Sequence, residues 1–232
     1  MTPENYNLEA EDLWITTEDN EQLHSWYFPN EKSNRIIVLS HGNAGNISHR
    51  LDIAQTLLET GAAVLMYDYR GYGKSTGKPS ESGLYLDIEA VIRALIDEKG
   101  YQENNIYLYG RSLGGAVAAY AATQFPVGGL VLDSAFKNLQ AMVRDVYPFV
   151  PSFLTRHEFP TQRFINERKN MPIMIMHSER DEIVRFHHGK TLYQATHEPK
   201  KFVTLDGGHN NNFQVSRNII LNQWILFLGW HK

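Results

Sequence analysis

The chain has 232 residues, of which 42% are hydrophobic and 21% are charged, and a formal net charge of −4. This length suits one domain with one core, and the composition is that of an ordinary globular protein. Because the chain has neither a basic stripe nor a run of like charges, we expect no nucleic-acid partner. The absence of cysteine excludes disulfides, thiolate metal sites and a cysteine nucleophile.

Residues 1–5 are polar and acidic, and they lack the basic and apolar regions of a signal peptide. No apolar run approaches the roughly 20 residues that a membrane-spanning helix needs. We therefore expect a cytoplasmic protein with no integral membrane segment.

Strand-like and helix-like segments alternate along the chain, which predicts an α/β fold with a mostly parallel sheet. Residues 13–17 and 22–28 flank a polar turn and predict an N-terminal antiparallel hairpin. The apolar runs that follow are typical of a sheet covered on both faces, and they lie at 35–40, 62–67, 105–109, 129–132, 172–177 and 201–205. Helical periodicity predicts helices at 48–60, 84–99, 112–124 and 215–228.

One long connection, residues 137–170, interrupts this alternation between two predicted strands. Long ordered connections of this kind are often lids or binding loops. We therefore predict a single domain over residues 1–232 with a cap inserted at about 137–170. The apolar residues of the cap are candidates for an acyl pocket, although packing of the cap on the core explains them equally well. They are Tyr147, Phe149, Phe153 and Leu154.

The strongest chemical signal is the G-x-S-x-G sequence at residues 110–114, which lies between a predicted strand and a predicted helix. In that setting a serine is held on a tight turn with its hydroxyl exposed. Ser112 would also lie at a helix N-terminus, where backbone N–H groups favour developing negative charge. The alternative is a serine that only caps the helix. We predict that Ser112 is a nucleophile.

A serine hydroxyl needs a neighbouring base, and among the downstream histidines His209 is the best candidate. It follows two glycines in a loop directly after a predicted strand, near the end of the sheet where Ser112 should emerge. Two acids then compete to orient the imidazole of His209. Asp181 lies in a polar loop after one strand, whereas Asp133 directly ends another. We favour Asp181 because its loop is longer and reaches further.

The loop at residues 41–46 follows the strand at 35–40 and precedes a helix. In a fold with this nucleophile turn, that loop supplies one N–H donor for the oxyanion, and the residue after the nucleophile supplies the other. We therefore predict an oxyanion hole formed by Asn43 and Leu113.

With these motifs in place, the chain resembles the Bem46-like branch of the α/β-hydrolase superfamily. The matching stretches are residues 41–46, 68–75, 110–115, 133–136, 177–184 and 208–210. The resemblance implies the α/β-hydrolase fold with helices on both faces of the sheet. It also favours Asp181 over Asp133 as the triad acid, and it implies backbone donors at Asn43 and Leu113.

The resemblance implies a serine hydrolase of the carboxylesterase or thioesterase type, with a small-molecule or lipid-like acyl ester as substrate. The same triad would also serve a peptidase, an amidase or an acyltransferase, and a non-catalytic binding protein of this fold is a further alternative. The sequence contains no metal-ligand or dinucleotide motif, so we expect no cofactor. It does not indicate an oligomeric state.

Overall fold

The computed structural model describes residues 1–146 and 157–230 of the chain. The strands are β1 (Glu11–Thr16), β2 (Gln22–Phe28), β3 (Ile36–Ser40), β4 (Ala63–Tyr67), β5 (Ile106–Arg111), β6 (Gly129–Asp133), β7 (Ile173–Ser178) and β8 (Lys200–Leu205). The α-helices are α1 (Leu51–Leu58), α2 (Glu81–Asp97), α3 (Leu113–Gln124), α4 (Leu139–Val146), α5 (Thr161–Glu167), α6 (His187–Ala195), α7 (Asn212–Val215) and α8 (Arg217–Leu228).

These strands form one 8-stranded sheet in the order β1-β2-β4-β3-β5-β6-β7-β8. The first two pairings, β1 with β2 and β2 with β4, are antiparallel. Every later pairing is parallel, from β4 with β3 through β7 with β8. The predicted N-terminal hairpin and the mostly parallel sheet are therefore confirmed.

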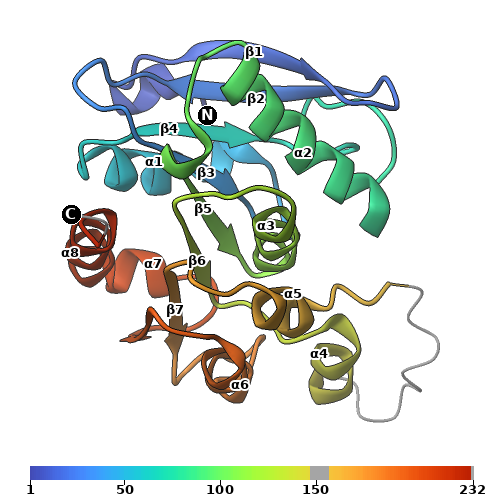
Figure 1. Cartoon of the computed structure of the whole chain (residues 1–232), viewed down its shortest axis with the longest axis vertical. Coiled ribbons are helices and arrows are strands. Elements are labelled where there is room, and N and C mark those ends of the chain that lie inside the picture. Colours follow the sequence, from blue (N-terminus) through green and yellow to red (C-terminus); the bar gives the residue numbers. More distant parts are fainter. Residues whose placement is uncertain (147–156, 231–232) are drawn as a thin grey trace.

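Helices cover both faces of the sheet, as predicted (Figure 1). Successive side chains of a strand point to opposite faces, so Val38 of β3 packs into one apolar cluster and Ile37 into the other. Helices α2, α3, α5 and α6 contribute buried side chains to the first cluster. Helices α1 and α8 contribute to the second, which includes the fully buried Trp224. A sheet buried on both faces explains why its central strands are apolar throughout.

The direction in which the chain adds strands reverses at β3. After β3 the chain crosses to β4 on one side, and it then returns to place β5 on the other side. Ligands of open α/β sheets bind beyond the carboxyl ends of the strands at such a switch point. The loops after β3 and β5 carry Asn43 and Ser112, so the topology places these two residues at this crevice.

The segment between β6 and β7 contains α4 and α5. Phe164 and Ile165 of α5 are buried in the cluster that includes α3, while α4 has no fully buried residue. The four predicted pocket residues, Tyr147, Phe149, Phe153 and Leu154, lie outside the described residues. The interpretation of this segment as a cap therefore stays a prediction.

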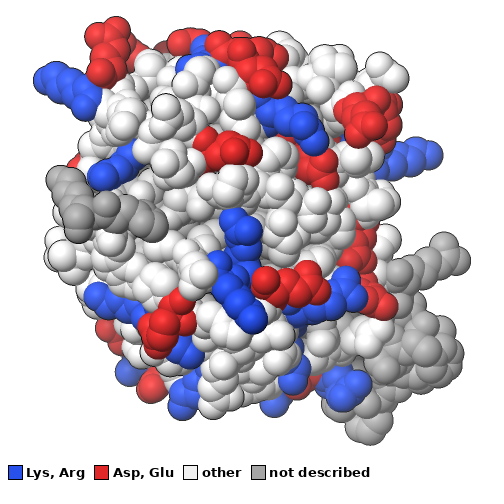
Figure 2. Space-filling model, in the orientation of Figure 1, with Lys and Arg blue, Asp and Glu red and all other residues white. Residues whose placement is uncertain are grey.

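Charged side chains of both signs are interspersed over the face shown in Figure 2, and neither sign dominates it. Among the helices of residues 1–146 and 157–230, none is both long and apolar enough to cross a bilayer.

Candidate active site

Ser112 occupies the sharp turn between β5 and α3, with φ of 52° and ψ of −116°. A positive φ is unusual for a residue other than glycine and costs about 1–3 kcal/mol, which the surrounding structure must offset. The Ser112 N–H donates to the Asp133 carbonyl at 2.9 Å, and the Ser112 carbonyl accepts from the Gly115 N–H at 2.9 Å. These bonds fix the turn from both sides.

The turn also requires glycine at position 114. A Cβ atom on Gly114 would lie 2.0 Å from the Ser40 carbonyl oxygen, which is far inside van der Waals contact. The start of α3 therefore packs directly on the end of β3. This close approach brings Ser112 against the loop after β3, where a Cβ on Gly42 would lie 3.5 Å from the Cβ of Ser112.

His209 lies in the loop after β8, and its Nδ1 is 2.8 Å from Asp181 Oδ2. Both residues are buried, and Ser112 and His209 line the same cavity of about 230 Å³. The structure thus brings Ser112, His209 and Asp181 to one end of the sheet.

Asp181 is held in place through its second carboxylate oxygen. Oδ1 accepts hydrogen bonds from the N–H groups of Ile183 at 3.0 Å and Val184 at 2.8 Å. His177, at the end of β7, donates from Nε2 to the Val184 carbonyl at 2.7 Å and so braces the same loop. Burial holds the pKa of His177 below its ordinary value, which favours the neutral ring.

Asp133, the competing acid, has different partners. Its Oδ2 accepts from Tyr109 at 2.7 Å and from Arg111 Nη1 at 2.9 Å, and its Oδ1 accepts from Ser134 at 2.8 Å. Within the described residues it makes no hydrogen bond to the His209 ring. Burial alone would raise the pKa of Asp133, but the charge of Arg111 and these donors outweigh burial and lower it.

Arg111 is a site residue that the sequence analysis missed. Its guanidinium is buried and joins Asp133 to the His209 loop, because Nη2 donates to the His209 carbonyl and, at 2.8 Å, to Asn212 Oδ1. Asn212 in turn donates to Ser134 Oγ at 2.8 Å. Arg111 stands inside the G-x-S-x-G motif, but nothing local indicates that it reaches a loop about 100 residues later in the chain.

Asn43 and Leu113, the two predicted oxyanion donors, line one cavity together with Ser112. Leu113 is the first residue of α3, and the first four N–H groups of a helix have no intrahelical acceptor. Among the described residues, none accepts a hydrogen bond from the N–H of Asn43 or of Leu113. Both N–H groups are therefore available to a ligand. Tyr72 donates from its hydroxyl to Asn43 Oδ1 at 2.6 Å and so restricts the movement of this loop.

Two cavities meet at Ser112, and Asn43 and Met142 also line both. The cavity of about 230 Å³ contains His209 and has a mixed lining, with apolar residues such as Ile53 and Phe213 and polar ones that include His49, Arg50, Asp52 and Gln214. The other, of about 290 Å³, is lined by apolar side chains that include Leu84, Phe136, Leu139 and Phe159. An elongated molecule bound at Ser112 can thus place unlike ends in two different environments.

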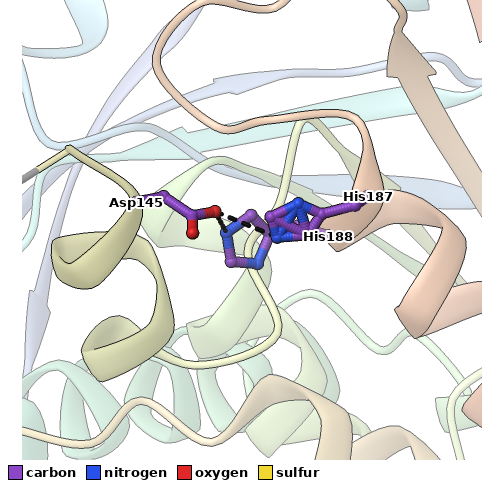
Figure 3. A group of neighbouring side chains, drawn as sticks. All are labelled: Asp145, His187 and His188. Carbon is purple, nitrogen blue, oxygen red and sulfur yellow. Dashed lines mark hydrogen bonds and ion pairs between the residues drawn. The ribbon is translucent and has the colours of Figure 1, made fainter. Parts of the chain in front are cut away.

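Asp145, His187 and His188 form a separate cluster whose potential ligand atoms lie within 4.8 Å of one another (Figure 3). Nε2 of His187 and of His188 lie 2.9 and 3.0 Å from the same Asp145 oxygen. The Lys137 N–H donates to Nδ1 of His188 at 3.3 Å, which places the proton of the neutral ring on Nε2, facing Asp145. A metal ion would require the opposite tautomer, so we interpret the cluster as a hydrogen-bonded link between α4 and α6.

Comparison with known proteins agrees with this architecture. A family model described as "Serine aminopeptidase, S33" matches residues 31–164. An uncharacterized protein of Mycobacterium tuberculosis is 34% identical over 222 residues, which cover 94% of this chain and 78% of the relative. Protein bem46 of Schizosaccharomyces pombe is 34% identical over 192 residues, which cover 79% of this chain and 64% of bem46.

Among solved structures, the esterase Pf2001 of Pyrococcus furiosus superposes with a TM-score of 0.84 at 25% sequence identity. The superposition covers 99% of this chain and 95% of the esterase. The α/β-hydrolase fold predicted from the sequence is therefore confirmed.

Proposed function

The chain belongs to the α/β-hydrolase family that its matching model describes as serine aminopeptidase S33, and from this premise we propose that it is a serine esterase with Ser112, His209 and Asp181 as its triad. The resemblance to the Bem46-like branch is likewise confirmed by the match to bem46. Family and structural neighbours support hydrolase activity, and the choice of an ester bond is our proposal.

One observation carries the proposal. Ser112, on a backbone turn with positive φ, shares one cavity with Asn43 and Leu113, whose N–H groups have no acceptor among the described residues, and another with a histidine whose Nδ1 is bonded to a buried carboxylate. Such a set of a nucleophile, a base, an orienting acid and two donors is what acyl transfer to serine requires.

In the proposed reaction, Ser112 Oγ attacks the ester carbonyl carbon while His209 Nε2 takes the hydroxyl proton. The carbonyl oxygen becomes negative between the N–H groups of Asn43 and Leu113, and Asp181 stabilises the imidazolium through Nδ1. His209 then gives the proton to the leaving alcohol, and the acyl group stays on Ser112. A water molecule, deprotonated by His209, attacks the acyl carbonyl and releases the acid.

The test is the initial rate of hydrolysis of p-nitrophenyl esters, from short to long acyl chains, by the wild type and by Ser112→Ala. We expect wild-type turnover that falls by about a thousandfold or more in the variant. A fluorophosphonate probe should label the wild type and not Ser112→Ala. If the wild type neither hydrolyses any ester nor reacts with the probe, the proposal is wrong and a binding role gains support.

The description of the family model names an aminopeptidase, so the same assay should include alanine p-nitroanilide. Turnover of the anilide with no turnover of esters would replace the esterase proposal with an amidase on the same triad.

A further inference from the structure

The position of His209 determines which end of a substrate enters which cavity; this inference rests on the proposed function. During acylation the base must return its proton to the departing oxygen, so the leaving group lies on the histidine side of the nucleophile. His209 lines the 230 Å³ cavity and does not line the 290 Å³ cavity. The leaving alcohol therefore occupies the 230 Å³ cavity, and the acyl group occupies the 290 Å³ cavity.

The acyl side is mostly apolar. Besides its apolar lining it contains Glu81, but that carboxylate already accepts hydrogen bonds from the N–H groups of Glu158 and Phe159 and from the Tyr85 hydroxyl. An apolar acyl chain fits this environment, because it removes apolar surface from water without leaving a polar group unpaired.

The leaving-group side carries a cation without a carboxylate partner. Arg50 borders this cavity and, within the described residues, forms no ion pair. Its Nη1 and Nη2 donate to the carbonyls of His49 and Ala44, while its Nε is buried and has no acceptor. A half-buried guanidinium held only by neutral carbonyls is favourably placed to bind an anion.

Within the part of the chain that the structure describes, the other charged residues of this cavity form no ion pair with Arg50. Arg111 is paired with Asp133, and Asp52 accepts a hydrogen bond at 2.7 Å from Gln214. Burial and the nearby charge of Arg111 lower the pKa of Arg50, and the attraction of Asp52 does not reverse that shift. Among the described residues Arg50 therefore has no carboxylate within ion-pair distance, and an anionic group bound in this cavity would supply one.

We propose that the substrate is an ester of an apolar acid with an alcohol that carries an anionic group, a carboxylate or a phosphate, and that Arg50 binds this group. Arg50 is then a specificity-determining residue that contacts the leaving group. The G-x-S-x-G signal gives no indication of this role, because Arg50 reaches the site from the turn before α1.

The test compares two esters that differ in charge and little else, the butanoyl esters of meta-hydroxybenzoate and of meta-hydroxybenzamide. We expect the wild type to prefer the anionic ester by about 10- to 100-fold in kcat/KM, the range for a hydrogen bond to a charged group. Arg50→Gln should bring the ratio of the two kcat/KM values close to that of spontaneous hydrolysis, and Arg50→Lys should retain part of the preference.

Arg93→Gln is the matched control, since Arg93 lies exposed on α2 and should leave both rates unchanged. Equal wild-type rates on the two esters, or an unchanged ratio in Arg50→Gln, would overturn the assignment of Arg50 while leaving the esterase intact. If the wild type hydrolyses neither these esters nor any p-nitrophenyl ester and does not react with a fluorophosphonate, the esterase proposal is overturned instead, and this inference with it.

Discussion

The ion pair between Arg111 and Asp133 lends itself to a quantitative test, because both side chains are buried and the pair links β5 and β6 to the His209 loop. Arg111→Met would leave the Asp133 carboxylate buried, with the Tyr109, Ser134 and Asn212 donors but no counter-ion. Removing one partner of a buried ion pair typically costs about 3–5 kcal/mol. We expect a loss of that size in the free energy of unfolding.

The losses of stability caused by substituting Arg111 and Asp133 should not be additive. Asp133→Asn alone leaves a buried guanidinium without a carboxylate, whereas the double variant Arg111→Met/Asp133→Asn contains neither charge. The double variant should therefore be more stable than the sum of the single losses implies, by about 2 kcal/mol or more. Urea unfolding followed by tryptophan fluorescence gives these values, provided that the m-value is unchanged.

Arg217 and Glu59 provide the control, because this ion pair lies on the exposed surface. Arg217→Met should cost less than about 1 kcal/mol, the usual range for exposed pairs. If Arg111→Met costs no more than this control, or if the two single losses add within about 0.5 kcal/mol, the assignment of the pair as a buried, coupled anchor is wrong.

Three further outcomes are expected. Asp181→Asn keeps an oxygen that can accept from its two backbone donors, but its amide N–H₂ cannot accept a hydrogen bond from the ring of His209. We therefore expect kcat on a p-nitrophenyl ester to fall by about 10⁴, with little change in the urea midpoint. A fall of less than tenfold would contradict this role of Asp181. Gly114→Ala places a Cβ against the Ser40 carbonyl at the end of β3 and should destabilise the fold. Gly100→Ala is the control, because Gly100 has a positive φ but open space around it, and it should destabilise the fold less. Thermal unfolding of the two variants measures the difference. Burial lowers the pKa of His188 from 6.5 to about 4; the neighbouring His187 and Lys137 lower it further, and Asp145 opposes the shift. Between pH 6.5 and pH 4, His188 is therefore protonated in the unfolded chain and neutral in the folded one. Stability should therefore fall as pH drops from 6.5 to 4, by up to about 3 kcal/mol, and urea unfolding of His188→Gln should show a smaller fall.

Most of the sheet is predictable from the sequence, because its strands are buried on both faces and appear as short apolar runs. The predicted runs and the observed strands agree within one or two residues at each end, for example 129–132 against Gly129–Asp133. Helix α6 shows why the remainder is harder to predict. It has few apolar residues, and the residues it buries are Leu192, Gly189 and the polar His188, so its position depends on tertiary contacts rather than on a hydrophobic stripe.

A site residue is easier to predict when the sequence signal that identifies it is short and local. Ser112 is marked by five consecutive residues, since the tight turn itself demands glycines next to it. The partnership of Asp181 with His209 depends on two loops 28 residues apart, so the sequence ranked the acids without deciding between them. Arg50 and Arg111 act through contacts that no local pattern encodes.

The favoured acid Asp181 and its competitor Asp133 are both linked to His209, but through different groups. β6, β7 and β8 are adjacent and parallel, so Asp133, Asp181 and His209 all emerge at one edge of the sheet. Asp181 holds the imidazole of His209, whereas Asp133 holds its main chain through Arg111. A histidine on a glycine-containing loop can move in two ways, by rotation of its ring and by displacement of the loop, and here one carboxylate restricts each. The two carboxylates therefore have different structural roles, one at the ring of His209 and one at its main chain.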